Sequence, residues 1–210
     1  MNDKTTLICI PCMDSVPTQF AQSLATLTRV GKCFVAFQMG SLIYNARNDL
    51  ARKSLEMGAD YSLWFDSDMV FETDVFQRLL DTMEKTNADI VSGLYFRRVQ
   101  PYSPVIFSKL EIGEKTEWEN CYDYPNEPFE CAGIGFGCVL VKNEVFIDVA
   151  QTFGNMFAPI GGVGEDLAFC WRARQCGYKI ICDPNIKLGH VGHYVVGENM
   201  YKAFRGKKNE

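Results

Sequence analysis

Short apolar runs alternate with helix-like segments through the first half of the chain, and this alternation constrains the fold more than any other feature. The runs are rich in β-branched and aromatic residues, whereas the segments between them repeat apolar residues at helical spacing. Such alternation is typical of a mainly parallel sheet covered by helices on both faces. The sequence therefore predicts an α/β fold. The expected strands are residues 5–10, 33–37, 61–65 and 88–93.

Three helices are expected between and after these strands. The first follows Pro17, which suits the first turn of a helix, and ends before Gly31. The second spans residues 42–57 and is stopped by Gly58. The third carries apolar residues at helical spacing between positions 75 and 83.

The second half of the chain has a different pattern. Residues 100–128 are expected to be irregular, with prolines and several aromatic residues. Residues 129–142 are predicted to be a glycine-interrupted strand pair, and residues 158–184 a glycine-rich loop, a helix that ends at Gly177 and a strand. At 210 residues the chain suggests one domain. We therefore expect this half to be the substrate side of that domain, followed by a tail over residues 196–210.

Composition and charge disfavour several classes of protein. The net charge of −5 gives no electrostatic reason to expect nucleic-acid binding. No apolar run approaches the roughly 20 residues that span a bilayer, so no transmembrane segment is expected. The N-terminus has too short an apolar run for a secretory signal. Residues 205–208 are locally basic and are predicted to be a solvated tail.

The nine cysteines are an odd number, and several fall inside expected strands. Buried, reduced thiols of this kind indicate a cytoplasmic protein. Cys9 and Cys12 have C-x-x-C spacing, but Cys9 lies within a strand rather than at the start of a helix. There is no second cysteine pair at zinc spacing, so redox or zinc chemistry is not favoured.

Two carboxylates, Asp66 and Asp68, follow the third expected strand directly. Ligands of such sheets bind beyond the carboxyl ends of the strands, where Pro11 and Cys12 are also expected. Mg²⁺ and Mn²⁺ take oxygen ligands and commonly join one or two carboxylates to substrate phosphates. A metal site that assists the departure of a nucleoside diphosphate is one interpretation. A hydrated surface turn is the other.

A second acidic pair, Glu165 and Asp166, opens a helix after a glycine-rich loop. One interpretation is a general base on a flexible loop that takes a proton from an acceptor hydroxyl. The other is that acidic residues simply favour helix N-termini through the helix dipole. The helix end is expected to keep the carboxylate ionised and to lower its basicity.

Histidine and arginine provide further candidates. His190 and His193 are the only histidines and share one loop, where imidazole could bind Mn²⁺. Exposed loop histidines are the alternative. Arg47 lies in the first turns of the second helix and could bind a diphosphate through two hydrogen bonds. A solvated helix face is equally compatible with its charged neighbours.

Taken in order along nearly the whole chain, these motifs resemble a nucleotide-sugar-dependent glycosyltransferase of the GT-A fold, and are most similar to the large family 2. The motifs are the strand that opens the nucleotide site, the strand-terminal D-x-D, the E-D pair after glycines and the late histidine. The resemblance implies a Rossmann-like GT-A domain, in which residues 1–99 bind the nucleotide and residues 100–195 form the acceptor and catalytic half.

The resemblance also implies roles for individual residues. Asp68, with Asp66, would hold Mn²⁺ or Mg²⁺ on the donor diphosphate, and His190 would be the late metal ligand, with His193 as the alternative. Asp66 would also contact the ribose or sugar. The remaining implied roles are Asp166 as the base of an inverting transfer, Glu165 as the residue that positions the acceptor or the loop, and Pro11, Cys12, Arg47 and Ser67 as donor-binding residues.

One position departs from the family pattern. Family members often carry an aspartate at the end of the second strand to bind uracil, whereas this chain has Gln38 there. The Gln38 amide can still donate and accept hydrogen bonds, so it is assigned to the nucleotide site without fixing the base. The acceptor is expected to be a sugar or another hydroxyl compound, bound by the aromatic residues between positions 95 and 124.

Two other functions remain open on the sequence alone. A sugar-phosphate nucleotidyltransferase would use a related sheet, but it usually has a glycine-rich basic loop after the first strand, and "PCMDSVPTQ" contains neither glycine nor a basic residue. A non-catalytic protein that binds sugars or nucleotide-sugars could share the fold. Such a protein would have no need for both acidic pairs together with His190.

Overall fold

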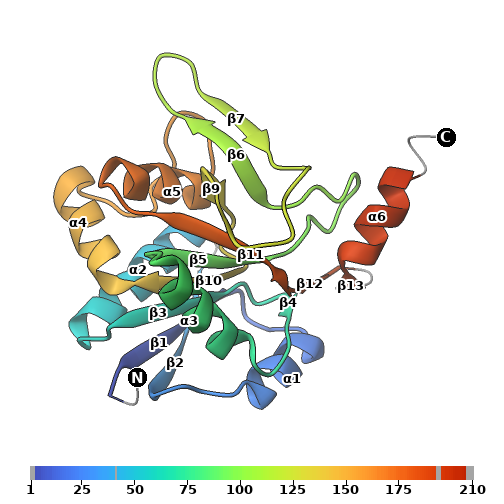
Figure 1. The fold of residues 1–210 in the computed structure, drawn as a ribbon. Coiled ribbons are helices and arrows are strands. Elements are labelled where there is room, and N and C mark those ends of the chain that lie inside the picture. The colour runs from blue at the N-terminus through green and yellow to red at the C-terminus, as the bar shows by residue number, and fades with distance from the viewer. Residues whose placement is uncertain (1–2, 41, 193–194, 207–210) are drawn as a thin grey trace.

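A computed structural model describes residues 3–40, 42–192 and 195–206, and a seven-stranded sheet forms its centre (Figure 1). Five strands run in the same direction, whereas the fourth and the last run antiparallel to their neighbours. The strands are, in order across the sheet, β2 (Lys32–Met39), β1 (Thr5–Cys12), β3 (Tyr61–Phe65), β10 (Cys138–Lys142), β5 (Ile90–Leu94), β11 (Ile180–Lys187) and β8 (Phe129–Glu130).

The mainly parallel α/β sheet predicted from the sequence is confirmed, and all four expected strands of the first half are present. β2 is longer than predicted, and β5 begins two residues later. The strand pair expected at residues 129–142 is instead three strands in two sheets, because β9 (Gly133–Ile134) pairs with a separate hairpin while β8 and β10 join the central sheet.

Helices cover both faces of the sheet, as expected. α2 (Ile43–Glu56), α4 (Asn143–Phe153) and α5 (Glu165–Gln175) contribute to the core on one face. α1 (Thr18–Thr26) and α3 (Val75–Thr86) contribute to the core on the other. α4 has no counterpart among the expected helices. None of the helices in the described ranges is long and apolar enough to cross a membrane.

The strand before the first acidic pair is anchored on both faces of the sheet. Trp64 and Phe65 are fully buried, and as neighbours in a strand they point to opposite faces. Trp64 packs against Phe136 and Phe157 with ring centroids 5.6 Å away in each case. Phe65 stacks on Phe71 with centroids 4.1 Å apart. β3 is therefore a rigid base for the carboxylates that follow it.

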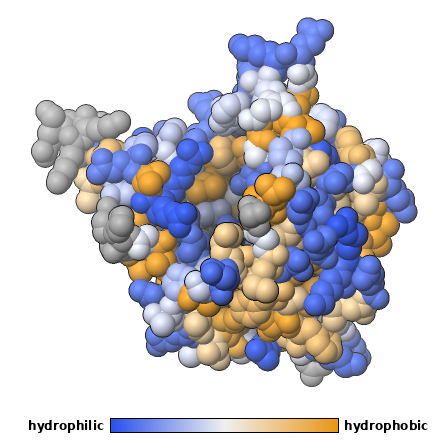
Figure 2. All heavy atoms as spheres, turned by 180° about the vertical axis from the view of Figure 1, so that it is seen from behind, coloured by the Kyte–Doolittle hydropathy of each residue, from blue (hydrophilic) through white to orange (hydrophobic). Residues whose placement is uncertain are grey.

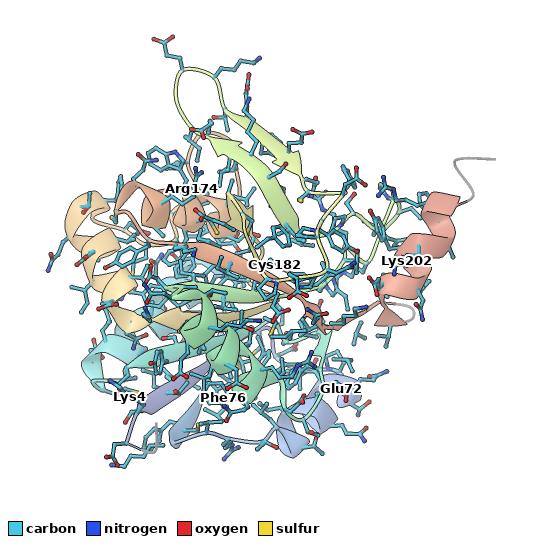
Figure 3. The ribbon with its side chains drawn as sticks, in the orientation of Figure 1. Lys4, Glu72, Phe76, Arg174, Cys182 and Lys202 are labelled. Atoms are coloured by element: carbon cyan, nitrogen blue, oxygen red, sulfur yellow. The ribbon has the colours of Figure 1, made fainter. Side chains whose placement is uncertain are left out.

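The residues labelled in Figure 3 include buried and exposed side chains. Phe76 on α3 and Cys182 on β11 are fully buried, whereas Lys4 and Lys202 are exposed. All nine cysteines are free thiols, and burial raises the pKa of Cys9. Cys9 and Cys12 both lie in β1 rather than at the start of a helix, in line with the low expectation of redox chemistry.

A small three-stranded sheet joins two distant parts of the chain. It contains β13 (Val195–Val196), β12 (Gly189–Val191) and β4 (Met69–Val70). His190 pairs with Met69, and the backbone N–H of Val191 donates to the carbonyl oxygen of Asp68 over 2.7 Å. This pairing places His190, which lies in a strand rather than in the expected loop, beside the first acidic pair.

The irregular conformation expected for residues 100–128 is wrong for part of that segment. β6 (Ile106–Glu111) and β7 (Glu117–Asn120) form a hairpin that projects from the body of the protein (Figure 1). Ile106 and Phe107 are buried, and β6 also pairs with β9. Burial of this apolar edge and pairing with a distant strand favour β structure despite the nearby prolines.

The chain end is also more ordered than the expected tail. α6 (Glu198–Gly206) includes Arg205, and Tyr201 of this helix stacks on Phe96 with ring centroids 4.8 Å apart. Arg205 contacts the carbonyl oxygen of Tyr122 and the Asp123 carboxylate. The end of the chain is therefore helical up to residue 206 rather than an irregular tail, although residues 205 and 206 are exposed to solvent as expected, and residues 207–210 lie outside the described part of the chain.

Candidate active site

The two aspartates that follow β3 point to different partners. The turn between them is closed by a hydrogen bond from the Met69 N–H to the Asp66 carbonyl oxygen, 3.2 Å long. Asp66 contacts Arg47, whereas Asp68 contacts His190 and Arg98. Both carboxylates are partly exposed, with 31% of the Asp66 side chain and 23% of the Asp68 side chain accessible. Each can therefore meet a ligand from solvent.

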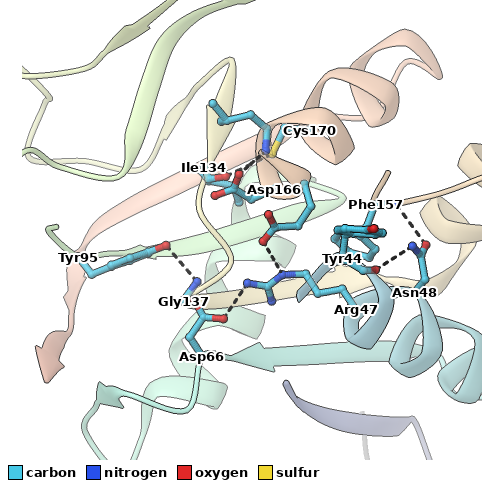
Figure 4. A network of polar contacts seen from close by, with 12 residues as sticks. Tyr44, Arg47, Asn48, Asp66, Tyr95, Ile134, Gly137, Phe157, Asp166 and Cys170 are labelled. Carbon is cyan, nitrogen blue, oxygen red and sulfur yellow. Dashed lines mark hydrogen bonds and ion pairs between the residues drawn. The ribbon is translucent and has the colours of Figure 1, made fainter. Parts of the chain in front are cut away.

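Arg47 on α2 links the two acidic pairs (Figure 4). Its Nη2 donates to Asp66 Oδ1 over 2.7 Å, and its Nε donates to Glu165 Oε1 over 3.2 Å. The guanidinium lies over the ring of Phe136, 5.2 Å from the centroid, and only 3% of the side chain is exposed. Nη1 is buried and has no hydrogen-bond partner among the described residues. Arg47 thus bridges two carboxylates, and its place in a nucleotide pocket stays a prediction.

Asp68 and His190 form the second contact of the site. Asp68 Oδ2 lies 3.3 Å from His190 Nε2, and His190 Nδ1 lies 2.9 Å from the carbonyl oxygen of Phe96. Burial opposes ionisation of Asp68, but the hydrogen bond and charge of His190 outweigh it and lower the Asp68 pKa. Burial likewise opposes protonation of His190, and the Asp68 carboxylate outweighs it and raises the His190 pKa.

This pair fits a divalent cation in part. A metal-binding histidine generally donates its other ring N–H to a backbone carbonyl or carboxylate, as Nδ1 of His190 can to Phe96. Asp68 and His190 then offer one oxygen and one nitrogen at the carboxyl end of the sheet. Asp66 does not join them, and the described residues contain no cluster of three or more histidine, cysteine or acidic side chains suited to a metal. His193 lies outside the described residues.

Asp166 and Glu165 open α5, as the sequence predicts, with Gly164 at the N-cap position. Burial, followed by the neighbouring charge of Glu165, raises the pKa of Asp166 to about 6, although a backbone hydrogen bond from Leu167 and the charge of Arg47 act in the opposite direction. The sequence led us to expect a lowered basicity from the helix end. Burial outweighs the helix end here, and the resulting pKa suits a general base near neutral pH.

The nucleotide-site candidates lie on adjacent strands. Pro11 on β1 pairs with Gln38 on β2. The β1–β3 pairing joins Cys9 to Trp64, so Pro11 and Asp66 each follow that pair by two residues. The Gln38 amide nitrogen lies 3.4 Å from the carbonyl oxygen of Met39. The remaining candidates, Cys12 and Ser67, are partly exposed at the same end of the sheet.

The surface around these strand ends has an apolar part. Met13, Met39 and Leu42 are at least half exposed. Figure 2 shows apolar residues gathered over the lower part of the face opposite to that of Figure 1.

Tyr95 was expected to be one of the aromatic residues that bind the acceptor, but its ring is buried and it supports the acidic turn instead, a role that sequence reasoning missed. The hydroxyl of Tyr95 accepts a hydrogen bond from the Gly137 N–H over 3.1 Å, and the Gly137 carbonyl accepts one from the Asp66 N–H over 3.2 Å (Figure 4). A Cβ atom at Gly137 would lie 2.7 Å from Cζ of Tyr95. The "GFG" immediately before β10 was the available signal, because glycine in or beside a strand often marks a close approach.

Replacing Gly137 by alanine should therefore destabilise the fold by about 1–3 kcal/mol, the usual effect of overpacking a tight core. Urea unfolding measures this loss. Gly113→Ala is the matched control, because a Cβ there would meet no described atom within 4 Å. Equal stability of the two variants would contradict the role given to the Tyr95–Gly137 contact.

Comparisons with known proteins define the class of fold. No family model and no curated protein matches the sequence. Among solved structures, A197 from STIV matches with a TM-score of 0.64 and 19% identity, over 90% of this chain and 86% of that one. GalNAc-T7 with UDP, GalNAc and Mn²⁺ matches with a TM-score of 0.61 and 12% identity, over 90% of this chain.

These likenesses concern the fold. The chain is a single mixed α/β domain with a mostly parallel central sheet, and this is the architecture of GT-A glycosyltransferases. It matches only 44% of the GalNAc-T7 chain.

Proposed function

We propose that the protein is a metal-dependent glycosyltransferase that moves a sugar from a nucleoside-diphosphate sugar to an acceptor hydroxyl, with inversion at the sugar carbon. The observation that carries this proposal is that Asp68 lies 3.3 Å from His190 and only two residues from Asp66, which Arg47 joins to Glu165. The structurally similar GalNAc-T7, which was solved with UDP, GalNAc and Mn²⁺, supports the proposal of a metal-dependent glycosyltransferase.

The donor half is assigned to residues 1–99. Asp68 and His190 would hold Mn²⁺ or Mg²⁺, which supplies positive charge to the departing diphosphate. Asp66, kept in place by Arg47, would contact the ribose or the sugar. Pro11 and Gln38 lie side by side at the ends of β1 and β2, where the resemblance to family 2 places the nucleotide base.

The acceptor half is assigned to residues 100–195. Asp166 is proposed to take the proton of the acceptor hydroxyl, a task that its raised pKa of about 6 favours. Glu165 is held by Arg47, so the start of α5 is fixed relative to the donor side. Trp118 is 49% exposed, so its ring is accessible for stacking on a sugar, whereas the Tyr122 ring is covered on one side by the Arg205 guanidinium.

The metal assignment is tested by replacing Asp68 with alanine. We expect the variant to bind Mn²⁺ more than about 100-fold more weakly, because even partners that only orient metal ligands contribute 10–100-fold. Titration with Mn²⁺ followed by electron paramagnetic resonance measures this affinity. Asp74→Asn is the control, because Asp74 is exposed and contacts Arg78 on its own helix, and this variant should bind Mn²⁺ as the unaltered protein does. Unchanged affinity in Asp68→Ala would exclude Asp68 as a ligand.

A further inference from the structure

Asp68 has a second cationic partner that the proposed function does not use. Nη1 of Arg98 lies 2.6 Å from Oδ2 of Asp68, the same oxygen that faces Nε2 of His190 at 3.3 Å. One carboxylate oxygen is thus shared by a guanidinium and an imidazole. A divalent cation bound to Asp68 and His190 would compete with the guanidinium for this oxygen.

Arg98 is placed so that it can leave this contact. It follows β5 in a short connecting segment, and 53% of its side chain is exposed to solvent. Asp68 and Arg98 line the same cavity of about 480 Å³, together with Pro17, Val99, Val191 and Gly192. A side chain with this exposure loses little when its ion pair breaks, because exposed pairs contribute about 0–1 kcal/mol.

We propose that the Arg98 guanidinium occupies the position on Asp68 that a divalent cation would take, and that it moves to the diphosphate of the donor when the cation binds. This inference rests on the proposed function, since it assumes a metal at Asp68. The guanidinium and a divalent cation repel each other at contact distance, so both cannot keep the same oxygen. Once released, the guanidinium finds a partner in the diphosphate, whose oxygens it can bind in pairs.

In this proposal Arg98 has one partner without a bound cation and another partner with it. Without a cation, Asp68 keeps a positive partner and avoids an unpaired, partly buried charge. With a cation and a diphosphate, the positive charge of Arg98 moves from the aspartate to the leaving group. Arg98 therefore has opposite effects on the two ligands: it weakens metal binding and strengthens diphosphate binding.

The neighbouring arginine offers a matched control. Arg97 is exposed, precedes Arg98 in the same segment and carries the same charge. Its backbone N–H donates to the Ser103 carbonyl oxygen, a contact that survives a change of side chain. Arg97→Ala removes one positive charge from the neighbourhood without removing the contact to Asp68, so it separates the general effect of charge from the specific one.

The test uses the full chain as the unaltered protein, Arg98→Ala and Arg97→Ala. Mn²⁺ affinity is measured by electron paramagnetic resonance without nucleotide. Arg98→Ala should bind Mn²⁺ about fivefold more tightly than the unaltered protein, the effect of one exposed ion pair. Arg97→Ala should differ by less than about twofold. Equal affinities of the two variants would overturn the competition between Arg98 and the cation.

The second half of the test uses calorimetry to measure the affinities for UDP and GDP at saturating Mn²⁺. Arg98→Ala should bind its preferred diphosphate about tenfold more weakly than Arg97→Ala, since a charge-assisted contact is lost. Equal diphosphate affinities of Arg98→Ala and Arg97→Ala would overturn the proposed movement of Arg98 to the diphosphate. Mn²⁺ binding by the unaltered protein with no gain in Arg98→Ala would overturn this inference alone. Failure of both proteins to bind Mn²⁺ would overturn the proposed metal site as well.

Discussion

Replacing Asp166 by asparagine is expected to slow sugar transfer by about 10²- to 10⁴-fold, the usual contribution of a general base. The amide keeps the size of the carboxyl group but cannot take the proton of the acceptor hydroxyl. Donor affinity should remain unchanged, because Asp66 and Asp68 are untouched. Transfer is measured by release of nucleoside diphosphate in the presence of an acceptor. Turnover equal to that of the unaltered protein would exclude Asp166 as the base.

The pH dependence gives an independent readout of the same group. The pKa of Asp166 is raised to about 6, so the rate of the unaltered protein should rise with pH through that value and then level off. Glu144→Gln is a suitable control, since Glu144 lies in the first turn of a different helix, α4. This variant should keep both the rate and the pH profile.

Stability measurements distinguish a lost base from a damaged fold. A carboxyl group whose pKa is raised by folding destabilises the folded state at every pH above that pKa, and this effect disappears below its pKa in the unfolded chain. Asp166→Asn should therefore have a higher Tm than the unaltered protein at about pH 8 and the same Tm near pH 3. A lower Tm at about pH 8 would show that the substitution damages the fold.

Replacing Arg47 by alanine should destabilise the protein by about 3 kcal/mol, the lower end of the range for breaking a buried ion pair. The arginine side chain is 3% exposed, and its removal takes away the cation that both Asp66 and Glu165 contact. The partial exposure of Asp66 places the loss at the lower end. Urea unfolding measures it, and weaker donor binding should accompany it because Asp66 loses its anchor.

Arg52→Ala is the matched control for this substitution. Arg52 lies on the same helix, α2, but it is 56% exposed and pairs only with Asp49 among the ion pairs observed for the described residues. Its removal should change stability by less than about 1 kcal/mol. Arg47→Lys should lose an intermediate amount, because an ammonium keeps the charge but lacks the planar fork that reaches two carboxylates. Similar losses for Arg47→Ala and Arg52→Ala would contradict the bridging role.

Much of the fold could be predicted because its signals are local. Strands such as β3 are short apolar runs, and helices such as α2 show helical spacing that ends at a glycine. The direction of β10 could not be predicted, because an apolar run fits parallel and antiparallel pairing equally well. The β6–β7 hairpin depends on the pairing of β6 with β9, and these two strands are more than 20 residues apart in the chain.

The site shows the same division between local and distant causes. The position of Asp66 and Asp68 at a strand end follows from the sequence around them. Their divergence does not, because it depends on Arg47 from one helix and His190 from a strand that pairs with β4. Arg98 carried no sequence signal, since an arginine in a connecting segment usually has a solvated side chain.

The central claim is that Asp68 and His190 bind a nucleoside diphosphate through a divalent cation. Calorimetry with a panel of nucleoside diphosphates, with Mn²⁺ and with a chelator in its place, tests this claim most directly. We predict that binding requires Mn²⁺ and that one nucleobase is preferred. The preferred base is the one whose edge matches the hydrogen bonds that the Gln38 amide can donate and accept. Binding of equal strength in the chelator, or no binding to any member of the panel, would contradict the account.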